Sequence, residues 1–409
     1  MTRLYLEVTG CRLNACEAEE ISRRAAARGA TMVDSPGEAD VSLLMTCAVT
    51  SRSQARCRRA ARALLRGTTG RVVVGGCSAR LFPGDFATGS DRIRTARTAG
   101  DAVAGILGDG CSSDESGFFE ARSSRGSRSR ALLKIQDGCS NGCSYCIVPA
   151  ARGPSRSLEA ARIVEMAGDL EAEGFREIVL TGVDLASWGA DLPGGGDLPD
   201  LVARIARSVG SRIRLGSLEP MRLTRDFVRR LAVPGMCRHF HVPFQSGSRA
   251  VRESMGRPGD PAEVLGWIAE FFPGAATGTD VIAGYPGETE EDFRMTLALA
   301  TDPRISYLHV FPFCPRPGTR ASAMHARADM CETARRAAML RSASESSRRR
   351  FRTASLGTSA RALVEGRSHD GGLVALTDNY IPLRAPEGAS EGDEISIPVT
   401  RENVLWNLR

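Results

Sequence analysis

Short apolar runs alternate with amphipathic stretches along the first 108 residues. The runs at residues 4–8, 41–45 and 72–74 predict strands, and the helical periodicity at 17–28 and 51–66 predicts helices, the second capped by Ser51. Strands that alternate with helices form parallel sheets, because each connection must cross over the sheet. We therefore expect an α/β fold that begins with a small parallel α/β domain over residues 1–108.

The same alternation continues through residues 131–350. Candidate strands lie at residues 131–135, 177–181, 213–215, 239–243, 279–283 and 308–311, and helical stretches lie between them, for example at 158–170 and 262–271. Six such units predict a larger parallel sheet, with functional residues at the carboxyl ends of its strands.

The chain changes character before and after this segment. Residues 109–130 are rich in Ser, Gly and Arg, which is typical of a linker. Residues 352–409 carry short runs at 359–364, 371–377, 380–384 and 394–400, separated by turn-forming residues. This pattern predicts a small antiparallel barrel or sandwich.

The composition is that of an ordinary soluble globular protein, with 42% apolar and 25% charged residues. A net charge of +6 permits a polyanionic partner without requiring one. Because we find no signal-peptide core and no 18-residue apolar run, we expect a cytoplasmic protein. Lys134 is the one lysine among 54 basic residues. Either this lysine is present by chance, or its ammonium group is needed beside the cysteine motif that follows it.

Cys139, Cys143 and Cys146 form the motif C-x3-C-x2-C, with Tyr145 before the third cysteine. A structural zinc site has four protein ligands, whereas each iron of a 4Fe-4S cluster needs one outer ligand. Three cysteines therefore leave one iron open to a ligand that is not protein. The alternatives are a zinc knuckle that lacks a ligand and a chance grouping of thiols. The motif resembles the radical S-adenosylmethionine (SAM) enzymes, in which SAM fills the open position.

Three further cysteines, Cys11, Cys47 and Cys77, follow the three predicted strands of the first segment. The carboxyl ends of parallel strands meet at one sheet edge, so these thiols are expected to converge. They could ligate a second cluster with an open iron, or be three small buried side chains. Gly10 and Gly76 precede two of them and would let the backbone approach an inorganic core, which favours the cluster.

Stretches along essentially the whole chain resemble the radical SAM methylthiotransferases. They include Thr9-Gly-Cys-Arg-Leu-Asn14, Thr46-Cys-Ala-Val-Thr50, Val74-Gly-Gly-Cys77, Ile135-Gln-Asp-Gly-Cys139, Leu180-Thr-Gly-Val-Asp184, Ser217-Leu-Glu-Pro220, Phe244-Gln-Ser-Gly247 and Asp280-Val-Ile-Ala-Gly-Tyr-Pro-Gly-Glu-Thr289. The six β/α units resemble the family's open (β/α)6 barrel. The stretch Leu376-Thr-Asp-Asn-Tyr-Ile-Pro-Leu-Arg384 resembles its RNA-binding TRAM domain, a small β-barrel.

The resemblance implies two 4Fe-4S clusters, one on each cysteine set, and SAM as both radical source and methyl donor. An electron donor such as a flavodoxin or ferredoxin would be needed. Polar and glycine residues at the strand ends are candidates for SAM binding, although each is also explained by ordinary turn chemistry. They are Gly182, Asp184, Glu219, Gln245, Gly284 and Gly287.

Branches of this family modify isopentenyladenosine in tRNA, threonylcarbamoyladenosine in tRNA, or an aspartate of a ribosomal protein. Residues 46–50, 151–156 and 377–382 are most similar to the threonylcarbamoyladenosine branch, which implies 2-methylthiolation of that nucleoside beside the anticodon. Arg152 and Arg156 are candidates to bind an RNA phosphate near the reacting base.

Five arginines of the second predicted helix share one face and form either a phosphate track or a solvated charged face. They are Arg52, Arg56, Arg59, Arg62 and Arg66. The tail has few basic residues, so it could instead act as a lid that excludes water from the reaction.

Two positions depart from the family pattern: Ala15 stands where the family usually has Gln, and Gly256 where it often has Arg. A different class also stays open, a non-catalytic iron–sulfur or zinc protein that binds RNA. Such a protein would bind metal without cleaving SAM, and it would leave the missing fourth ligand of the Cys139 motif unexplained.

Overall fold

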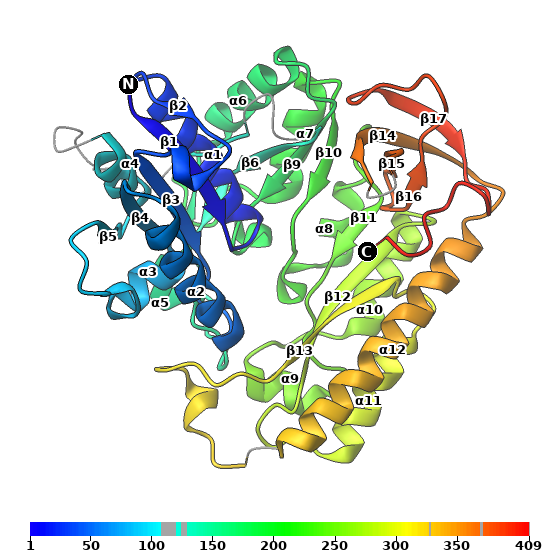
Figure 1. The fold of residues 1–409 in the computed structure, drawn as a ribbon. Coiled ribbons are helices and arrows are strands. Elements are labelled where there is room, and N and C mark those ends of the chain that lie inside the picture. Colours follow the sequence, from blue (N-terminus) through cyan, green and yellow to red (C-terminus); the bar gives the residue numbers. More distant parts are fainter. Residues whose placement is uncertain (108–119, 124–128, 327–328, 369–370, 409) are drawn as a thin grey trace.

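The computed structural model describes residues 1–107, 120–123, 129–326, 329–368 and 371–408. Figure 1 shows an amino-terminal α/β unit beside a central barrel, with a small β-sheet packed on the barrel near the carboxyl terminus. Most of the expected linker at 109–130, with Cys111, lies outside the described residues. Its described part is not loose, because Ser123 and Ala121 exchange backbone hydrogen bonds with the first barrel strand.

The amino-terminal unit is a five-stranded parallel sheet with the order β2-β1-β3-β4-β5. Its strands are β1 (Arg3–Val8), β2 (Thr31–Met32), β3 (Val41–Thr46), β4 (Arg71–Gly76) and β5 (Ile93–Thr95), and its helices are α1 (Arg12–Ala26), α2 (Ser51–Gly67), α3 (Cys77–Leu81) and α4 (Ala99–Leu107). Apolar clusters cover both faces, with α1 and α4 on one and α2 on the other. The predicted parallel α/β unit is therefore present.

Two helix starts differ from the sequence analysis. Helix α1 begins five residues before the expected Glu17, because Cys11 takes the N-cap position without a capping side chain and leaves no signal in the sequence. Helix α2 is capped by Thr50 rather than Ser51, since the Thr50 hydroxyl accepts a hydrogen bond from the Ser53 amide.

The central unit consists of six parallel strands. They are β6 (Ala131–Lys134), β9 (Glu177–Thr181), β10 (Arg212–Leu215), β11 (His239–His241), β12 (Ala276–Ala283) and β13 (Tyr307–Pro312). Two three-stranded sheets, β10-β9-β6 and β11-β12-β13, are joined by the bridges Ile213–Met236 and Ser217–His241. The barrel is open, because β6 and β13 stand at opposite edges and do not pair with each other.

Helices cover the outer face of the barrel, where alternate strand residues form the main hydrophobic core. They are α6 (Ala160–Ala172), α7 (Leu198–Ser208), α8 (Arg225–Arg230), α10 (Pro261–Phe271), α11 (Glu290–Thr301) and α12 (Met330–Ala354). The short helices α5 (Val148–Arg152) and α9 (Arg249–Met255) contribute no residue to this core. Phe240 on β11 and Leu308 on β13 point into this core. The period of two in a strand then directs their neighbours His239, His241, Tyr307 and His309 to the barrel interior.

The carboxyl-terminal unit is a four-stranded antiparallel sheet with the order β16-β15-β14-β17. Its strands are β14 (Ser359–Arg367), β15 (Leu373–Thr377), β16 (Pro382–Arg384) and β17 (Glu394–Pro398). Within the described residues, strand pairing does not close this sheet into the barrel expected from the sequence, since β16 and β17 remain edge strands.

This sheet covers the amino-terminal ends of the barrel strands. Arg212 and Arg214 at the start of β10 donate hydrogen bonds to the carbonyl oxygens of Leu376 and Thr377, and both pair with the fully buried Glu177. The cysteine loop lies at the opposite end of the barrel, after β6. The expectation that the tail acts as a lid over the reacting site is therefore wrong.

Candidate functional site

The loop that carries Cys139, Cys143 and Cys146 lies between β6 and α5, at the carboxyl end of the first barrel strand. Gly138 makes the turn into it with a φ of 70°. A Cβ atom at Gly138 would lie 1.9 Å from the carbonyl oxygen of Pro154, so no other residue fits without moving the backbone.

Burial raises the pKa of the Cys139 thiol to about 12 and that of Cys146 to about 11. The amides of Asn141 and Val148 donate hydrogen bonds of 3.4 Å to these two sulfurs. Such thiols keep their protons in the metal-free chain, and a coordinated metal removes them. No cysteine of the described chain forms a disulfide. The loop therefore offers three free thiols with amide donors, a set suited to metal binding.

Gln136, which the sequence analysis quoted but gave no role, ties the loop to the next strand. Its Nε2 donates to the carbonyl oxygen of Gly138 at 2.9 Å, and its Oε1 accepts from the amides of Val183 and Asp184 at 2.8 Å. A Cβ atom at Gly182 would lie 2.8 Å from that oxygen. Gly182 therefore allows the close approach that places Asp184 beside the loop.

Asp184, a predicted SAM-binding residue, is buried at the edge of the cysteine loop. Its Oδ2 accepts a hydrogen bond from Asn141 Nδ2 at 2.8 Å and lies 3.9 Å from Cys139 Sγ. Burial raises the pKa of its carboxyl group. The other oxygen, Oδ1, is buried without a hydrogen-bond partner in the described chain. An orphaned acceptor at this position is suited to a donor group on a ligand of the site.

Glu219 also faces the loop, but an arginine already engages it. Arg257 pairs with Glu219, and its other nitrogen, Nη1, lies 3.4 Å from Cys143 Sγ. Burial raises the pKa of the Glu219 carboxyl. The sequence analysis missed Arg257, which follows directly after the departure noted at Gly256.

Gln245 lines a cavity of about 150 Å³ beside the loop. Cys146 and Asp280 line the same cavity from the barrel, and Val49 and Thr50 line it from the amino-terminal unit. Gln245 holds a φ of 69°, uncommon for a residue with a side chain, and its amide donates to the Asp280 carbonyl oxygen at 2.8 Å. The cavity thus opens between two units of the chain.

Gly284 and Gly287 are not among the residues that line this cavity. A Cβ atom at Gly284 would lie 2.3 Å from Thr333 Oγ1 of helix α12, and the amide of Gly287 donates to the Ala326 carbonyl oxygen. Their proposed contact with SAM stays a prediction.

Cys11, Cys47 and Cys77 meet at the carboxyl ends of β1, β3 and β4. Burial, followed by the neighbouring thiols of Cys11 and Cys77, raises the pKa of the Cys47 thiol to about 11, so the three cysteines lie near one another. Gly76 has a φ of 86°, and its Cβ would lie 2.5 Å from the Thr46 carbonyl oxygen. The neighbouring strand therefore requires the glycine, and its approach to an inorganic core stays a prediction.

A buried ion-pair network lies between the two cysteine groups. Lys134 Nζ is 2.7 Å from a carboxylate oxygen of both Glu17 and Asp137, and Arg152 Nη1 is 3.0 Å from both carboxylates. Arg152 also donates to Asn14 at 2.7 Å. The lone lysine therefore does lie beside the cysteine loop, where it helps to join α1 to the barrel.

Arg152 is 8% exposed, and its guanidinium is engaged by this network. Its predicted contact with an RNA phosphate is incompatible with this arrangement. Arg156 is partly buried and donates to the Arg152 carbonyl oxygen at 3.4 Å. With Arg80 and Arg97 it lines a cationic cavity of about 90 Å³ next to Cys77.

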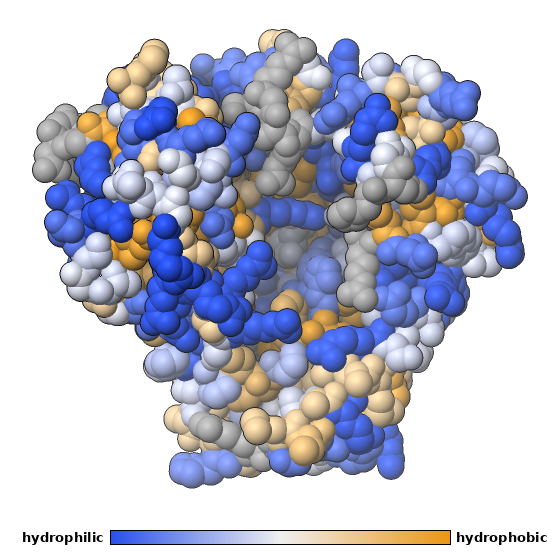
Figure 2. Space-filling view, in the orientation of Figure 1, coloured by the Kyte–Doolittle hydropathy of each residue, from blue (hydrophilic) through white to orange (hydrophobic). Residues whose placement is uncertain are grey.

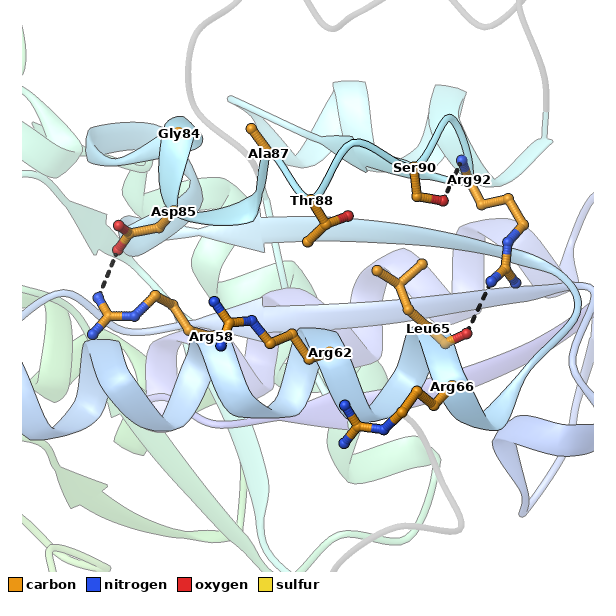
Figure 3. A pocket seen from close by; sticks show the side chains of 10 residues that line it. All are labelled: Arg58, Arg62, Leu65, Arg66, Gly84, Asp85, Ala87, Thr88, Ser90 and Arg92. Carbon is orange, nitrogen blue, oxygen red and sulfur yellow. Dashed lines mark hydrogen bonds and ion pairs between the residues drawn. The ribbon is translucent and has the colours of Figure 1, made fainter.

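Arg58, Arg62 and Arg66 of α2 border a groove of about 580 Å³ between this helix and residues 84–92 (Figure 3), whereas Arg52, Arg56 and Arg59 of the predicted stripe do not line it. Arg58 pairs with Asp85 at 3.0 Å, and Arg92 donates to the Leu65 carbonyl oxygen at 2.9 Å. Arg62 and Arg66 are exposed on the same wall and have no ion pair among the described residues. Part of the predicted stripe is thus free to meet an anion.

Two family models match the chain. Residues 133–300 match the radical SAM superfamily, and residues 3–95 match the uncharacterized protein family UPF0004. The threonylcarbamoyladenosine tRNA methylthiotransferase MtaB of Aquifex aeolicus is 30% identical over 95% of this chain and 98% of its own. The chain belongs to the radical SAM methylthiotransferases. The tRNA-2-methylthio-N(6)-dimethylallyladenosine synthase of Syntrophobacter fumaroxidans is 31% identical over 89% of this chain and 85% of its own.

The radical SAM methyltransferase TsrM of Kitasatospora setae is similar in structure, with a TM-score of 0.56 over 79% of this chain and 77% of its own. At 16% identity this similarity concerns the fold alone. As in the rest of the radical SAM family, a 4Fe-4S cluster and SAM are the cofactors of this methylthiotransferase. No helix within the described ranges is long and apolar enough to cross a membrane.

Proposed function

We propose that this methylthiotransferase 2-methylthiolates N6-threonylcarbamoyladenosine next to the anticodon of tRNA. The observation that carries the proposal is the cavity of about 150 Å³ between the radical SAM loop and the amino-terminal unit. Cys146 lines it on one side, and Val49 and Thr50, which follow Cys47, line it on the other. A base in this cavity would lie between the two groups. The MtaB enzymes of Aquifex aeolicus and Bacillus subtilis, which are named for this reaction, align with 95% and 80% of the chain.

We assign the SAM-binding 4Fe-4S cluster to Cys139, Cys143 and Cys146, and a second 4Fe-4S cluster to Cys11, Cys47 and Cys77. Each set offers three thiols and so leaves one iron open. When bound, the first cluster supplies the electron that cleaves SAM, and the second presents the sulfur to be transferred.

The side chains around the first cysteine set bind SAM and the base and orient the cysteine loop. The orphaned Oδ1 of Asp184 accepts a hydrogen bond from the amino group of SAM. Gly182 allows the backbone approach that places Asp184 there. Gln245 lines the cavity that receives the base. Gln136 and Arg257 are positioning residues, since they hold the loop and the Cys143 sulfur in place.

The chain divides functionally into an auxiliary-cluster domain at 1–108, a radical SAM barrel at 131–350 and a TRAM-like domain at 352–409. The exposed Arg62 and Arg66 on α2, together with Arg156, are the proposed contacts to tRNA phosphates. A small electron-transfer protein such as a flavodoxin or ferredoxin supplies the reducing electron.

A second candidate substrate is isopentenyladenosine in tRNA. The Syntrophobacter fumaroxidans relative named for the dimethylallyl nucleoside is 31% identical, about the same as the MtaB relatives. Overall identity therefore does not separate the two nucleosides.

Two measurements test these assignments. Anaerobic reconstitution should give about eight irons in the wild type and about four in each of two triple variants, Cys11/Cys47/Cys77→Ala and Cys139/Cys143/Cys146→Ala. Nucleoside analysis after incubation with SAM and reductant should show methylthiolation of tRNA that carries threonylcarbamoyladenosine. Four irons in the wild type would remove the second cluster, and product only from isopentenyladenosine tRNA would favour the second candidate.

A further inference from the structure

A layer of polar side chains crosses the barrel interior below the cysteine loop. His241 on β11, Asp280 on β12 and His309 on β13 lie on three neighbouring strands. The Oδ1 atom of Asp280 is 3.1 Å from His241 Nε2 and 3.1 Å from His309 Nδ1. Ser217 Oγ is 2.9 Å from the other ring nitrogen of His241. The carboxylate is hydrogen-bonded to His309 and lies within ion-pair distance of His241, whose Nε2 has no hydrogen bond in the described chain.

This layer is at the right depth to meet a group attached to a base in the cavity. Phe311 lines the cavity beside Cys146, and His309 precedes it by two residues on β13. Two residues of a strand span about 6–7 Å. Phe311 and His309 also line a second cavity of about 630 Å³ along the open edge of the barrel. An adenine near the cysteines could therefore extend its N6 substituent toward His309.

A guanidinium without a carboxylate partner lines the same second cavity. Arg12 begins helix α1 directly after Cys11, and its Nη2 donates to the Tyr380 hydroxyl at 3.1 Å. Among the described residues Arg12 has no ion pair. Tyr307, whose hydroxyl is bonded to His239 Nε2 at 2.9 Å, lines this cavity as well. The lining also contains Glu345 and Glu365, which pair with Arg348 and Arg130, so Arg12 is left as a cation without a carboxylate partner in this part of the chain.

These features select between the two candidate nucleosides. A threonylcarbamoyl group ends in a carboxylate and a hydroxyl, whereas an isopentenyl group is a hydrocarbon. A hydrocarbon would leave these polar groups without partners, and a site built for hydrogen bonds rejects such an analogue strongly.

We propose that Arg12 and His309 hold the polar end of the N6 substituent of the substrate adenosine, Arg12 binding its carboxylate and His309 its hydroxyl. Arg12 contributes a guanidinium that can bind a carboxylate with two hydrogen bonds. His309 donates from Nδ1 to Asp280, so its other ring nitrogen can accept a hydrogen bond from the hydroxyl of the substituent. His241 and Asp280 are positioning residues, because they orient His309. This inference rests on the proposed function and names the residues that give it its substrate.

The test measures binding of one anticodon stem-loop in two forms, with threonylcarbamoyladenosine and with unmodified adenosine. The proteins are the reconstituted full-length wild type and the variants Arg12→Met, Arg12→Lys and His309→Leu. Arg28→Met, an exposed arginine beyond the far end of α1, is the matched control. Arg12 is exposed and His309 half exposed, so the variants should fold, and circular dichroism and SAM cleavage without RNA check this.

Arg12→Met and His309→Leu should each weaken binding of the modified stem-loop about tenfold or more, and change binding of the unmodified one less than about twofold. Arg12→Lys should weaken binding of the modified stem-loop less than Arg12→Met does. Equal losses for both stem-loops would overturn the proposal and make Arg12 a phosphate contact. Unchanged binding would overturn it as well.

Two further readouts separate the causes of failure. If wild type methylthiolates the threonylcarbamoyl stem-loop while the variants keep full preference for it, the inference fails and the proposed function stands. If wild type acts only on isopentenyladenosine, both fail.

His241, Asp280 and His309 could together hold a metal ion, since their ligand atoms lie within 4.8 Å of one another. A non-iron metal lost in His309→Leu would make them ligands and overturn the proposal.

Discussion

Arg152 Nη1 lies 3.0 Å from Glu17 Oε1, which joins the central barrel to the first helix of the chain. Both side chains are buried, and the partners are 135 residues apart in sequence. Each of the two cysteine groups lies next to this network. Asp137 precedes Cys139 by two residues, and Arg152 lies close enough to Cys77 to lower the pKa of its thiol. The ion pair therefore helps to fix the distance between the two sites. Figure 2 shows a hollow between the amino-terminal unit and the rest of the molecule.

Replacing Arg152 should destabilise this junction. Arg152→Met leaves Glu17 and Asp137 buried with only Lys134 to balance them, which should cost about 3–5 kcal/mol. The urea midpoint, followed by circular dichroism, should fall, and Arg28→Met should leave it unchanged. An unchanged midpoint with weaker tRNA binding would instead restore Arg152 as a phosphate contact.

The same network predicts a dependence of stability on pH. Burial opposes ionisation of Glu17 and Asp137, but Arg152 and Lys134 outweigh it and hold the pKa of both carboxyls below the ordinary range. The stabilisation is therefore complete above about pH 4.5 and is lost as the pH falls through the lowered pKa values. The urea midpoint of Glu17→Gln should lie below that of wild type at pH 7. The difference should shrink as the pH falls below about 4, because Glu17 then takes up a proton in the unfolded wild type that it has to release on folding. A constant difference would contradict this account.

The sequence predicted local features well and distant contacts poorly. Residues 177–181 form β9 within the expected bounds, because a short apolar run between turn signals is a local property. The two groups of three cysteines were predicted for the same reason, and their role as ligands stays a prediction. The burial of Arg152 depends on Glu17, and the position of Arg257 depends on Glu219, 38 residues away. No local sequence pattern indicates such contacts. From the sequence alone, an arginine that forms a buried ion pair looks the same as one that binds a phosphate.

The groove beside α2 predicts how tRNA binding responds to salt. Arg62→Gln and Arg66→Gln should each weaken binding to all tRNAs and reduce the slope of log K against log salt by about one if each contacts a phosphate. Arg249→Gln on α9 is the control, since Arg249 is exposed and already paired with Glu253 at 2.8 Å. Slopes equal to that of wild type would show that this face of α2 is only solvated.

The turn into the radical SAM loop offers a test with a closely matched control. At Gly138 the positive φ and the Pro154 carbonyl oxygen both exclude a side chain, whereas at Gly142, within the same loop, a Cβ atom would have no neighbour within 4 Å. Gly138→Ala should therefore displace Cys139 relative to Cys143 and Cys146 and prevent the three thiols from holding one cluster. The reconstituted variant should retain about four of about eight irons and should not cleave SAM, while Gly142→Ala should match wild type in both measurements. Full iron content in Gly138→Ala would show that the loop tolerates a different backbone and that its geometry is not set by this turn.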